Sequence, residues 1–222
     1  IMSDNIRKHS LLILSGGLDS VTMLHEYAAE IALAVYFDYG SNHASREKSC
    51  ARYQAACAGV QFIEIDLGFM SRYFESSLLS GGDAIPDGEY ADDNMSSTVV
   101  PFRNGVMLSI AAGIAESRGL DTVMIANHGG DHAVYPDCRP AFIDAMGHAI
   151  AEGTYARLQL YAPYTDITKA DIARRGVTLG VDYSRTYSCY RGGERHCGRC
   201  ATCRERRQAL EAAGVFLDEY EI

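Results

Sequence analysis

The sequence feature that most constrains this chain is residues 11–20, Leu-Leu-Ile-Leu-Ser-Gly-Gly-Leu-Asp-Ser. The four apolar residues predict a buried strand. The two glycines predict a tight turn, and Asp19 and Ser20 are residue types that cap the start of a helix. Glycines let backbone N–H groups approach an anion, and a helix N-terminus carries partial positive charge. The stretch therefore predicts a phosphate-binding loop between the first strand and the first helix of an α/β fold.

The spacing within this loop separates it from two common nucleotide-binding motifs. No lysine follows Gly17, so it is not a Walker A loop, and it lacks the Gly-x-Gly-x-x-Gly pattern. Residues 15–20, Ser-Gly-Gly-Leu-Asp-Ser, resemble instead the PP-loop of N-type ATP pyrophosphatases, which cleave ATP between the α and β phosphates and adenylate a substrate oxygen. An ordinary glycine turn is the alternative. We expect ATP to bind Ile13, Leu14, Ser15, Gly16, Gly17, Leu18, Asp19, Ser20 and Val21.

Two residues of the loop are candidates for catalysis. The Asp19 carboxylate can hold Mg²⁺ against phosphate oxygens, because carboxylate oxygen is a preferred ligand of that ion. The Ser20 hydroxyl adds a hydrogen-bond donor beside the phosphates. We therefore predict that Asp19 and Ser20 take part in the reaction.

Strands and helices alternate along the rest of the chain, which predicts one α/β domain over residues 2–222. We expect a doubly wound, mainly parallel, Rossmann-like sheet of the PP-loop type. The polar residues that follow the strands are the loop at 15–20, residues 38–40 and residues 127–131, and they should meet in one cleft at the carboxyl ends. In the helix over residues 43–58 we expect Glu47 on the solvent side. The other expected strands are residues 32–37, 61–67, 122–126 and 158–161, and the other expected helices are 106–117, 140–152 and one from residue 168.

The segment from residue 68 to residue 97 differs from the rest, because it is rich in glycine and acidic residues. We expect a short helix near residues 69–79 and then a long loop. Long loops in compact domains are often functional lids. A tolerated surface insertion is the alternative.

Composition excludes several functions. The formal net charge is −9, which argues against direct binding of nucleic acid, since that needs clusters of Lys and Arg. No apolar run approaches the roughly 18 residues of a membrane span, and residues 106–115 are the longest candidate. Seven cysteines without a signal peptide predict a cytoplasmic protein whose clustered cysteines bind metal rather than form disulfides.

A cluster of four cysteines near the C-terminus is the second strong signal. Cys189, Cys197, Cys200 and Cys203 lie within fifteen residues, and the two-residue spacing of the last three lets thiolates point at one ion. We predict a tetrahedral Zn²⁺ site in a small helical subregion, residues 184–214. The site should be structural, because all four ligands come from the protein. An iron–sulfur cluster is the competitor, but the Cys-x₃-Cys-Pro continuation is missing.

Four motifs taken together resemble the 7-cyano-7-deazaguanine synthase (QueC) family. They are residues 15–20, Val-Pro-Phe-Arg-Asn at 100–104, Tyr-Pro-Asp-Cys-Arg at 135–139, and the cysteine pattern over 189–203. They occur in order along nearly the whole chain. At residues 41–43 this chain has Ser-Asn-His, where many family members have Gln-Arg-His.

The resemblance implies a homodimeric zinc enzyme that converts 7-carboxy-7-deazaguanine and ammonia to the 7-nitrile with ATP. Adenylation gives the carboxylate a leaving group, ammonia then forms an amide, and a second adenylation allows the nitrile to form. A lysine would stabilise the developing phosphoryl charge, and Lys169 is the candidate. A solvated helix lysine is the alternative.

The implied substrate needs two kinds of recognition. An acidic side chain would face the N1–H and 2-amino edge of the base, and a cation would face the carboxylate. We predict Asp137 for the first role and Arg139 or Arg103 for the second, with Asn104 also in the substrate site. The alternative is that Asp137 and Arg139 pair to hold a loop.

Three other functions remain open from sequence. The first is a PP-loop enzyme that modifies tRNA, which this acidic, compact chain disfavours. The second is a QueC-like enzyme that acts on a protein or nucleic acid. The third is a zinc-stabilised nucleotide-binding module without catalysis.

Overall fold

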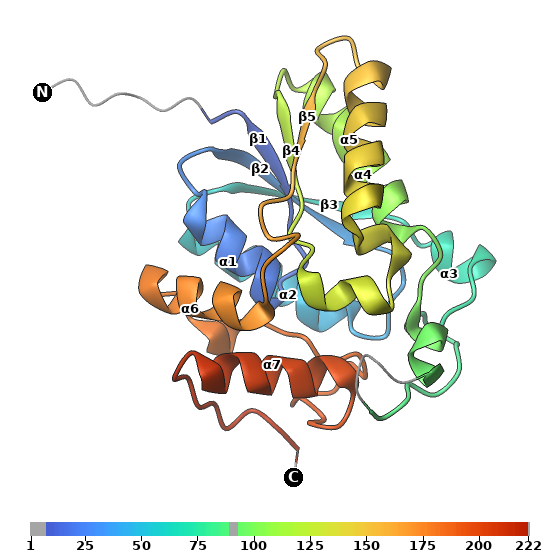
Figure 1. Ribbon diagram of the computed structural model, residues 1–222, viewed down its shortest axis with the longest axis vertical. Coiled ribbons are helices and arrows are strands. Elements are labelled where there is room, and N and C mark those ends of the chain that lie inside the picture. The colour runs from blue at the N-terminus through green and yellow to red at the C-terminus, as the bar shows by residue number, and fades with distance from the viewer. Residues whose placement is uncertain (1–7, 89–92, 222) are drawn as a thin grey trace, which may run out of the picture.

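A five-stranded parallel sheet forms the centre of the computed structural model, which describes residues 8–88 and 93–221 (Figure 1). The strand order is β3-β2-β1-β4-β5. The chain winds outward from β1 to β3 and returns to β4 on the other side of β1. The predicted doubly wound sheet is confirmed, and the strand order reverses between β1 and β4. The strands are β1 (Ser10–Ile13), β2 (Ile31–Asp38), β3 (Gln61–Asp66), β4 (Thr122–Met124) and β5 (Gln159–Tyr161).

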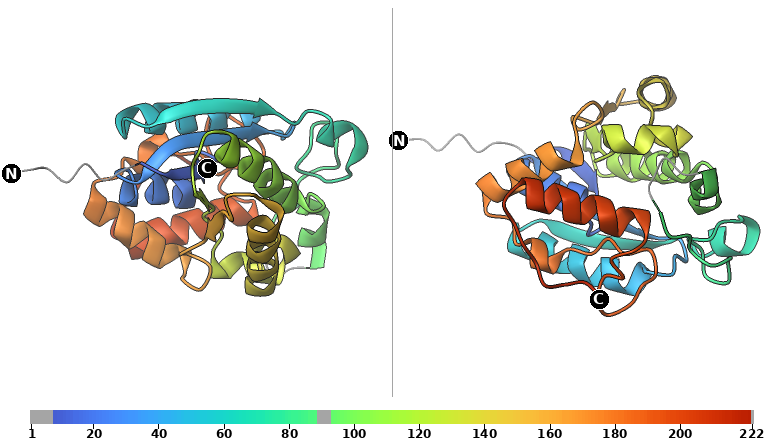
Figure 2. Two further views of the ribbon diagram at one scale, coloured as in Figure 1. Left: turned by 90° about the horizontal axis from the view of Figure 1, so that it is seen from above. Right: turned by 60° about the horizontal axis from the view of Figure 1, so that its bottom comes forward.

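Helices cover both faces of the sheet because neighbouring strand residues point to opposite faces. Leu11 packs with buried residues of α4 and α5, whereas Leu12 packs with those of α1, α2, α6 and α7. α6 and α7 lie side by side on their face (Figure 2). The helices are α1 (Leu18–Glu26), α2 (Ala44–Cys57), α3 (Met70–Tyr73), α4 (Arg103–Ser117), α5 (Pro140–Gly153), α6 (Lys169–Leu179) and α7 (Ala201–Ala212), with 3₁₀ turns at Asp93–Thr98, Gly129–Ala133, Pro136–Cys138 and Tyr183–Arg185.

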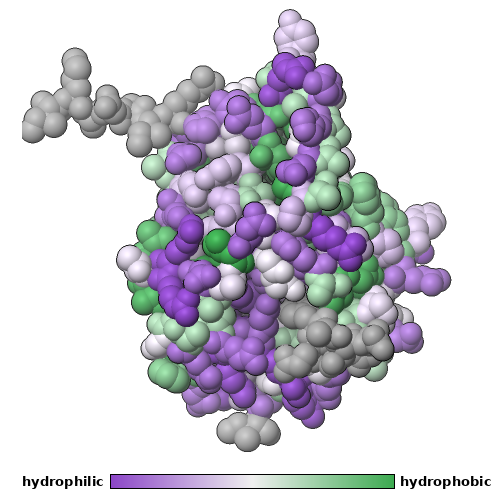
Figure 3. All heavy atoms as spheres, in the orientation of Figure 1, coloured by the Kyte–Doolittle hydropathy of each residue, from purple (hydrophilic) through white to green (hydrophobic). Residues whose placement is uncertain are grey.

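The helix α4 is the apolar centre of its layer. The stretch Met95–Ser117 is long and apolar enough to cross a membrane, contrary to the expectation that no run reaches that length. Half of that stretch is buried, and Leu108 and Ala111 are fully buried in the core beside β1 and β4. The helix is therefore apolar because it packs inside this domain. On the face drawn in Figure 3, hydrophilic side chains cover most of the surface.

Element boundaries differ from prediction at several ends, and α4 begins at Arg103 instead of residue 106. The helix α1 begins at Leu18 with Gly17 at the N-cap, so Asp19 and Ser20 lie inside the first turn instead of capping it. The strand β4 ends at Met124, and the next two residues, Ile125 and Ala126, line the pocket. The helix α3 covers only Met70–Tyr73.

The segment expected to be a lid lies partly outside the described residues, since 89–92 are not among them. Its described part contacts the C-terminal region. The guanidinium of Arg191 donates hydrogen bonds to the Ile85 carbonyl (3.1 Å) and the Asp87 carboxylate (2.6 Å). The lid role stays a prediction.

Gly16 is the residue at which the loop meets two other segments. Its backbone is left-handed, with φ +84°, which favours glycine. A Cβ at this position would lie 2.3 Å from the carbonyl oxygen of Glu47 in α2. On the other side, the Gly16 carbonyl accepts a hydrogen bond from the Tyr187 amide at 3.0 Å. Only glycine fits this junction.

This junction predicts that Gly16→Ala destabilises the protein and weakens ATP binding. The left-handed backbone alone costs about 1–2 kcal/mol for a residue with a Cβ, and the contact with Glu47 adds to that cost. Urea unfolding and ATP titration would measure both effects. The control is Gly113→Ala, since a Cβ on this α4 residue meets no atom within 4 Å and should stabilise the helix by about 0.5–1 kcal/mol. A Gly16→Ala protein as stable as the wild type would contradict the prediction.

Candidate functional site

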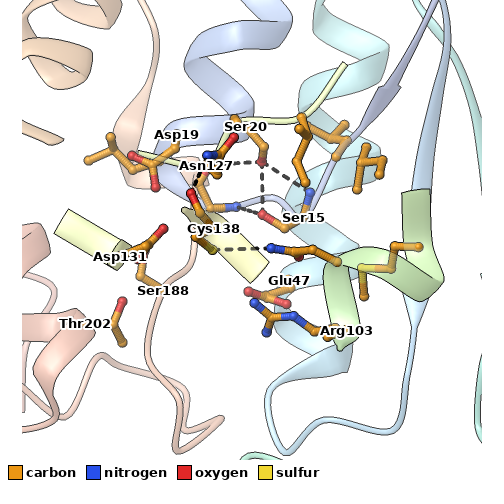
Figure 4. Close-up of a pocket in the computed structure, with 18 of the residues that line it drawn as sticks. Ser15, Asp19, Ser20, Glu47, Arg103, Asn127, Asp131, Cys138, Ser188 and Thr202 are labelled. Atoms are coloured by element: carbon orange, nitrogen blue, oxygen red, sulfur yellow. Dashed lines mark hydrogen bonds between the residues drawn. The ribbon is translucent and has the colours of Figure 1, made fainter. Parts of the chain in front are cut away.

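A pocket opens at the carboxyl ends of β1, β2 and β4, where the strand order reverses (Figure 4). The predicted convergence of polar residues at this edge is confirmed for residues 15–20 and 127–131. The loop after β2 contributes Tyr39. Predicted site residues that line the pocket are Ile13, Leu14, Ser15, Gly17, Leu18, Asp19, Ser20, Arg103, Asn104 and Lys169. Gly16, Val21, Asp137 and Arg139 are not among its lining residues.

The loop is held in shape by its two serines. The Ser20 hydroxyl accepts a hydrogen bond from the Ser15 amide at 3.2 Å and lies 3.0 Å from the Ser15 hydroxyl. The Ser15 hydroxyl in turn accepts from the Gly17 amide at 3.2 Å. These bonds close a small ring at the N-terminus of α1. The helix therefore begins at the floor of the pocket, where its positive end favours an anion.

Lys169 lies in one wall of the pocket and not in bulk solvent. Its side chain is only 10% exposed, and Nζ donates to a Glu205 carboxylate oxygen at 2.6 Å and lies 3.5 Å from Asp19 Oδ2. A capping box between Thr168 and Asp171 starts α6 at this lysine. The solvated-lysine alternative is therefore wrong for this residue, although its catalytic role stays a prediction.

His128 joins three carboxylates on the same wall. Its Nδ1 accepts a hydrogen bond from the Gly130 amide at 3.0 Å, so the proton of the neutral ring is on Nε2. Nε2 faces Asp131 at 3.6 Å, and Asp19 and Glu205 at 3.9 Å each. His128 therefore presents an N–H group to the carboxylates and offers no lone pair there to act as a base.

Asp19 retains one oxygen for a ligand. Its Oδ1 is buried and has no hydrogen-bond partner among the described residues. A buried, unsatisfied carboxylate oxygen beside a phosphate-binding loop fits the coordination of Mg²⁺.

Glu47 and Arg103 line another part of the pocket. The expectation that Glu47 faces solvent is wrong: its side chain is 13% exposed and lines the pocket. The start of α2 packs against the loop at Gly16, and this contact turns Glu47 inward. Burial raises the pKa of Glu47 to about 8 and lowers the pKa of His43, whose Nε2 is 3.6 Å away, to about 4. Arg103 donates to the Tyr39 hydroxyl at 3.2 Å, and its guanidinium lies 5.5 Å from the Tyr39 ring centroid.

Asp137 lies behind the pocket wall, at the start of α4. Its Oδ2 accepts a hydrogen bond from the Asn104 amide at 2.8 Å, and the Asn104 side chain donates to the Asp137 carbonyl at 3.0 Å. Arg139 donates to the His132 carbonyl instead, and within residues 8–88 and 93–221 no ion pair joins Asp137 to Arg139. The substrate roles predicted for Asp137 and Arg139 stay predictions.

The four clustered cysteines form a compact group of buried thiols. Their Sγ atoms lie within 4.8 Å of one another, and those of Cys197 and Cys203 are 3.9 Å apart. A tetrahedral site with Zn–S bonds of about 2.3 Å places its sulfur atoms about 3.8 Å apart, which is close to the Cys197–Cys203 separation. The amides of Arg199 and Cys200 point at Cys197 Sγ. The group therefore fits a single tetrahedral ion.

The cysteine subregion also forms part of the pocket. Ser188, next to Cys189, and Thr202, next to Cys203, both line it. The buried Arg206 holds this region together, donating to Glu219 at 2.6 Å, Thr186 at 2.8 Å and the Tyr183 carbonyl at 2.8 Å. The cysteine cluster and the pocket wall are therefore parts of one packed region.

Several residues of the pocket had no individual role predicted from the sequence. Asp131 and His128 follow a predicted strand, which is a signal that places them at this edge. Ser188 and Thr202 carry no such signal, because only the tertiary structure brings the cysteine region to this pocket. Glu205 of α7 is placed beside the pocket through its contact with Lys169.

Comparisons with known proteins agree over most of the chain. A family model described as Queuosine biosynthesis protein QueC matches residues 9–214. The chain is 58% identical over 215 residues to a 7-cyano-7-deazaguanine synthase of Porphyromonas gingivalis, covering 96% of this chain and 98% of that protein. It is 47% identical over 203 residues to the protein of the same name from Desulfotalea psychrophila, covering 90% and 93%. In structure it resembles NMN synthetase from Francisella tularensis, with a TM-score of 0.53 at 9% identity, covering 95% of this chain and 79% of that one. That likeness shows a shared fold alone.

The buried Glu47 carboxyl predicts a pH dependence of stability. Because its folded pKa is about 8 against an ordinary value of 4.5, the folded state holds a proton that the unfolded chain lacks between these values. Stability should therefore fall as pH rises from 6.5 to 8. We expect Glu47→Gln to remove about 1–2 kcal/mol of this fall, at about 1.4 kcal/mol per pH unit and proton.

Urea unfolding of the metal-loaded wild type and variant at pH 6.5 and pH 8 measures this difference. His43 stays neutral in both folded proteins over that range and cancels. The control is Glu211→Gln, an exposed carboxyl on α7, which should leave the fall unchanged. An equal fall in wild type and Glu47→Gln would contradict the prediction.

Proposed function

The chain belongs to the QueC family, and from this premise we propose that it converts 7-carboxy-7-deazaguanine and ammonia to 7-cyano-7-deazaguanine with ATP. The observation that carries the proposal is that the PP-loop, Lys169 and Arg103 line one pocket. The loop supplies an anion site and Arg103 supplies a cation for a carboxylate. The acid and the α-phosphate of ATP would therefore meet in this pocket.

Different residues of the pocket would have different roles in adenylation. Asp19 would hold Mg²⁺, which when bound neutralises phosphoryl charge. Lys169, whose Nζ lies 3.5 Å from Asp19 Oδ2 in the same wall, would donate to the phosphate oxygens on which charge develops. Acyl adenylate plus ammonia gives the amide and AMP, and the adenylated amide gives the nitrile and a second AMP. Ser20 holds the loop through its bonds to Ser15, so its role is to fix the donors.

We propose that the four-cysteine site binds Zn²⁺ and is structural. The thiolates fill all four positions of a tetrahedron, which leaves none for substrate. The site would stabilise the pocket wall, because Tyr187, two residues before Cys189, donates to the Gly16 carbonyl. Metal binding and formation of the ATP site would then be linked.

The remaining expectations concern the setting of the enzyme. The family resemblance supports a homodimer in the cytoplasm, and a net charge of −9 supports a free base as substrate rather than a nucleic acid. A QueC-like enzyme with a macromolecular substrate is the second candidate. Turnover of the free acid distinguishes it from the proposed function.

The proposed reaction predicts the behaviour of Asp19→Ala. Wild-type protein with ATP, Mg²⁺, ammonia and the acid should form AMP and the nitrile, detected by mass. Asp19→Ala should stay folded and lose at least about a hundredfold in rate, because metal-assisted charge stabilisation is worth several kcal/mol. The control is Asp144→Ala on the exposed side of α5. Near wild-type AMP formation by Asp19→Ala at saturating Mg²⁺ would remove Asp19 from the mechanism.

The cysteine site predicts one tightly held zinc ion per chain. Elemental analysis should find zinc in the wild type and none in a Cys200→Ser, Cys203→Ser double variant. That variant should also bind ATP more weakly, because the Tyr187 contact to the loop depends on this region. Cys57→Ser, an exposed cysteine on α2, is the control. Iron with a visible charge-transfer band, or zinc retained by the double variant, would contradict the assignment.

A further inference from the structure

One part of the pocket holds an acidic and a basic side chain that the protein does not pair with each other. Glu47 and Arg103 both line the pocket, and Figure 4 shows both side chains pointing into it. Across the described ranges, no ion pair of 4.0 Å or less joins them, and Arg103 has no carboxylate partner within that distance. The Glu47 carboxyl accepts no hydrogen bond from any described residue, and its nearest basic neighbour is His43 Nε2 at 3.6 Å.

Such an arrangement is costly unless something else satisfies it. A largely buried carboxyl without hydrogen-bond donors loses the solvation it has in water, and so does a guanidinium. An acidic and a basic side chain that face one cavity without an ion pair between them are complementary to a ligand that carries donors at one edge and an anion at another. Stacking on Tyr39 holds the Arg103 fork in one orientation, which suits a planar ligand.

We propose that Glu47 recognises the guanine-like edge of the substrate, accepting hydrogen bonds from N1–H and the 2-amino group. This assignment rests on the proposed function and names the residue that selects its base. A carboxylate accepts two parallel N–H bonds in the same bidentate geometry that it forms with arginine. The 6-oxo group and the 7-carboxylate continue along the same side of the ring system, where Arg103 supplies donors. Glu47 is therefore a specificity-determining residue.

The fold also places Glu47, which would contact this edge of the base, beside the expected ATP site. The backbone carbonyl of Glu47 lies against Gly16 of the phosphate-binding loop. The Glu47 side chain therefore starts next to the expected site of the ATP phosphates. Burial raises the pKa of Glu47 to about 8 in the free pocket, so binding of the base would release the carboxyl proton to solvent and pair the carboxylate with the two N–H donors. Asp137 is less suited, because its Oδ2 already accepts the Asn104 amide and it does not line the pocket.

The test is a cycle of two ligands and three proteins, read by calorimetric titration. The ligands are 7-carboxy-7-deazaguanine and the analogue that lacks the 2-amino group. We expect the wild type to prefer the amino ligand, and Glu47→Gln to bind it roughly ten- to a hundredfold more weakly while losing most of that preference. Asp137→Asn is the matched comparison and should keep the preference. ATP affinity and metal content, unchanged in Glu47→Gln, report that the variant is folded.

Each outcome decides the assignment. A Glu47→Gln protein that keeps the full preference overturns it, and a preference lost only in Asp137→Asn transfers the role to Asp137. Should Glu47→Gln also lose ATP, Glu47→Asp keeps the charge, and a retained amino preference in that variant supports the assignment while a lost preference overturns it. A wild type that binds the acid but does not form the nitrile refutes the proposed function and leaves the binding cycle to decide the role of Glu47. A wild type that does not bind the acid refutes both.

Discussion

The close approach of three chain segments at Gly16 is the constraint on which the rest of the structure depends. The loop after β1 lies against the first turn of α2 on one side and accepts a hydrogen bond from Tyr187 on the other. No side chain fits between these backbones. The contact with α2 turns Glu47 into the pocket, and the contact with Tyr187 brings the cysteine subregion to the same edge of the sheet. A single residue without a Cβ thus allows one pocket to be built from the two ends of the chain.

The two walls of the pocket carry different sets of charged side chains. On one wall, Lys169 and His128 present N–H groups to the carboxylates of Asp19, Asp131 and Glu205. That wall carries more acid than base, which suits a divalent cation that accompanies ATP. On the other wall, Glu47 and Arg103 do not pair with each other. This arrangement suits a purine-like ligand that carries N–H donors at one edge and an anionic group at another. The net charge of −9 therefore describes the surface and says little about this cleft, because local pairing decides the field inside it.

The cysteine subregion reaches the pocket through residues that flank its cysteines. Ser188 and Thr202 line the cavity, and their neighbours in sequence, Cys189 and Cys203, belong to the cluster. Arg206, fully buried, ties the same segment to Glu219 near the C-terminus. A bound ion would fix several residues at once, which compensates for the small apolar core of this region.

The sequence by itself determined the features that depend on short-range patterns. The loop at residues 15–20, the alternation of strands and helices, and the spacing of Cys197, Cys200 and Cys203 are each encoded within a few neighbouring residues, so local geometry is enough to predict them. Only the tertiary structure decided which side chains enter the pocket. Glu47 is on a helix that could present it to water, and Asp137 belongs to a motif that could face substrate. Packing against Gly16 turned Glu47 inward. The backbone amide of Asn104, at the start of α4, donates a hydrogen bond to the Asp137 carboxylate. Both outcomes depend on contacts between residues more than thirty positions apart, which no local pattern records.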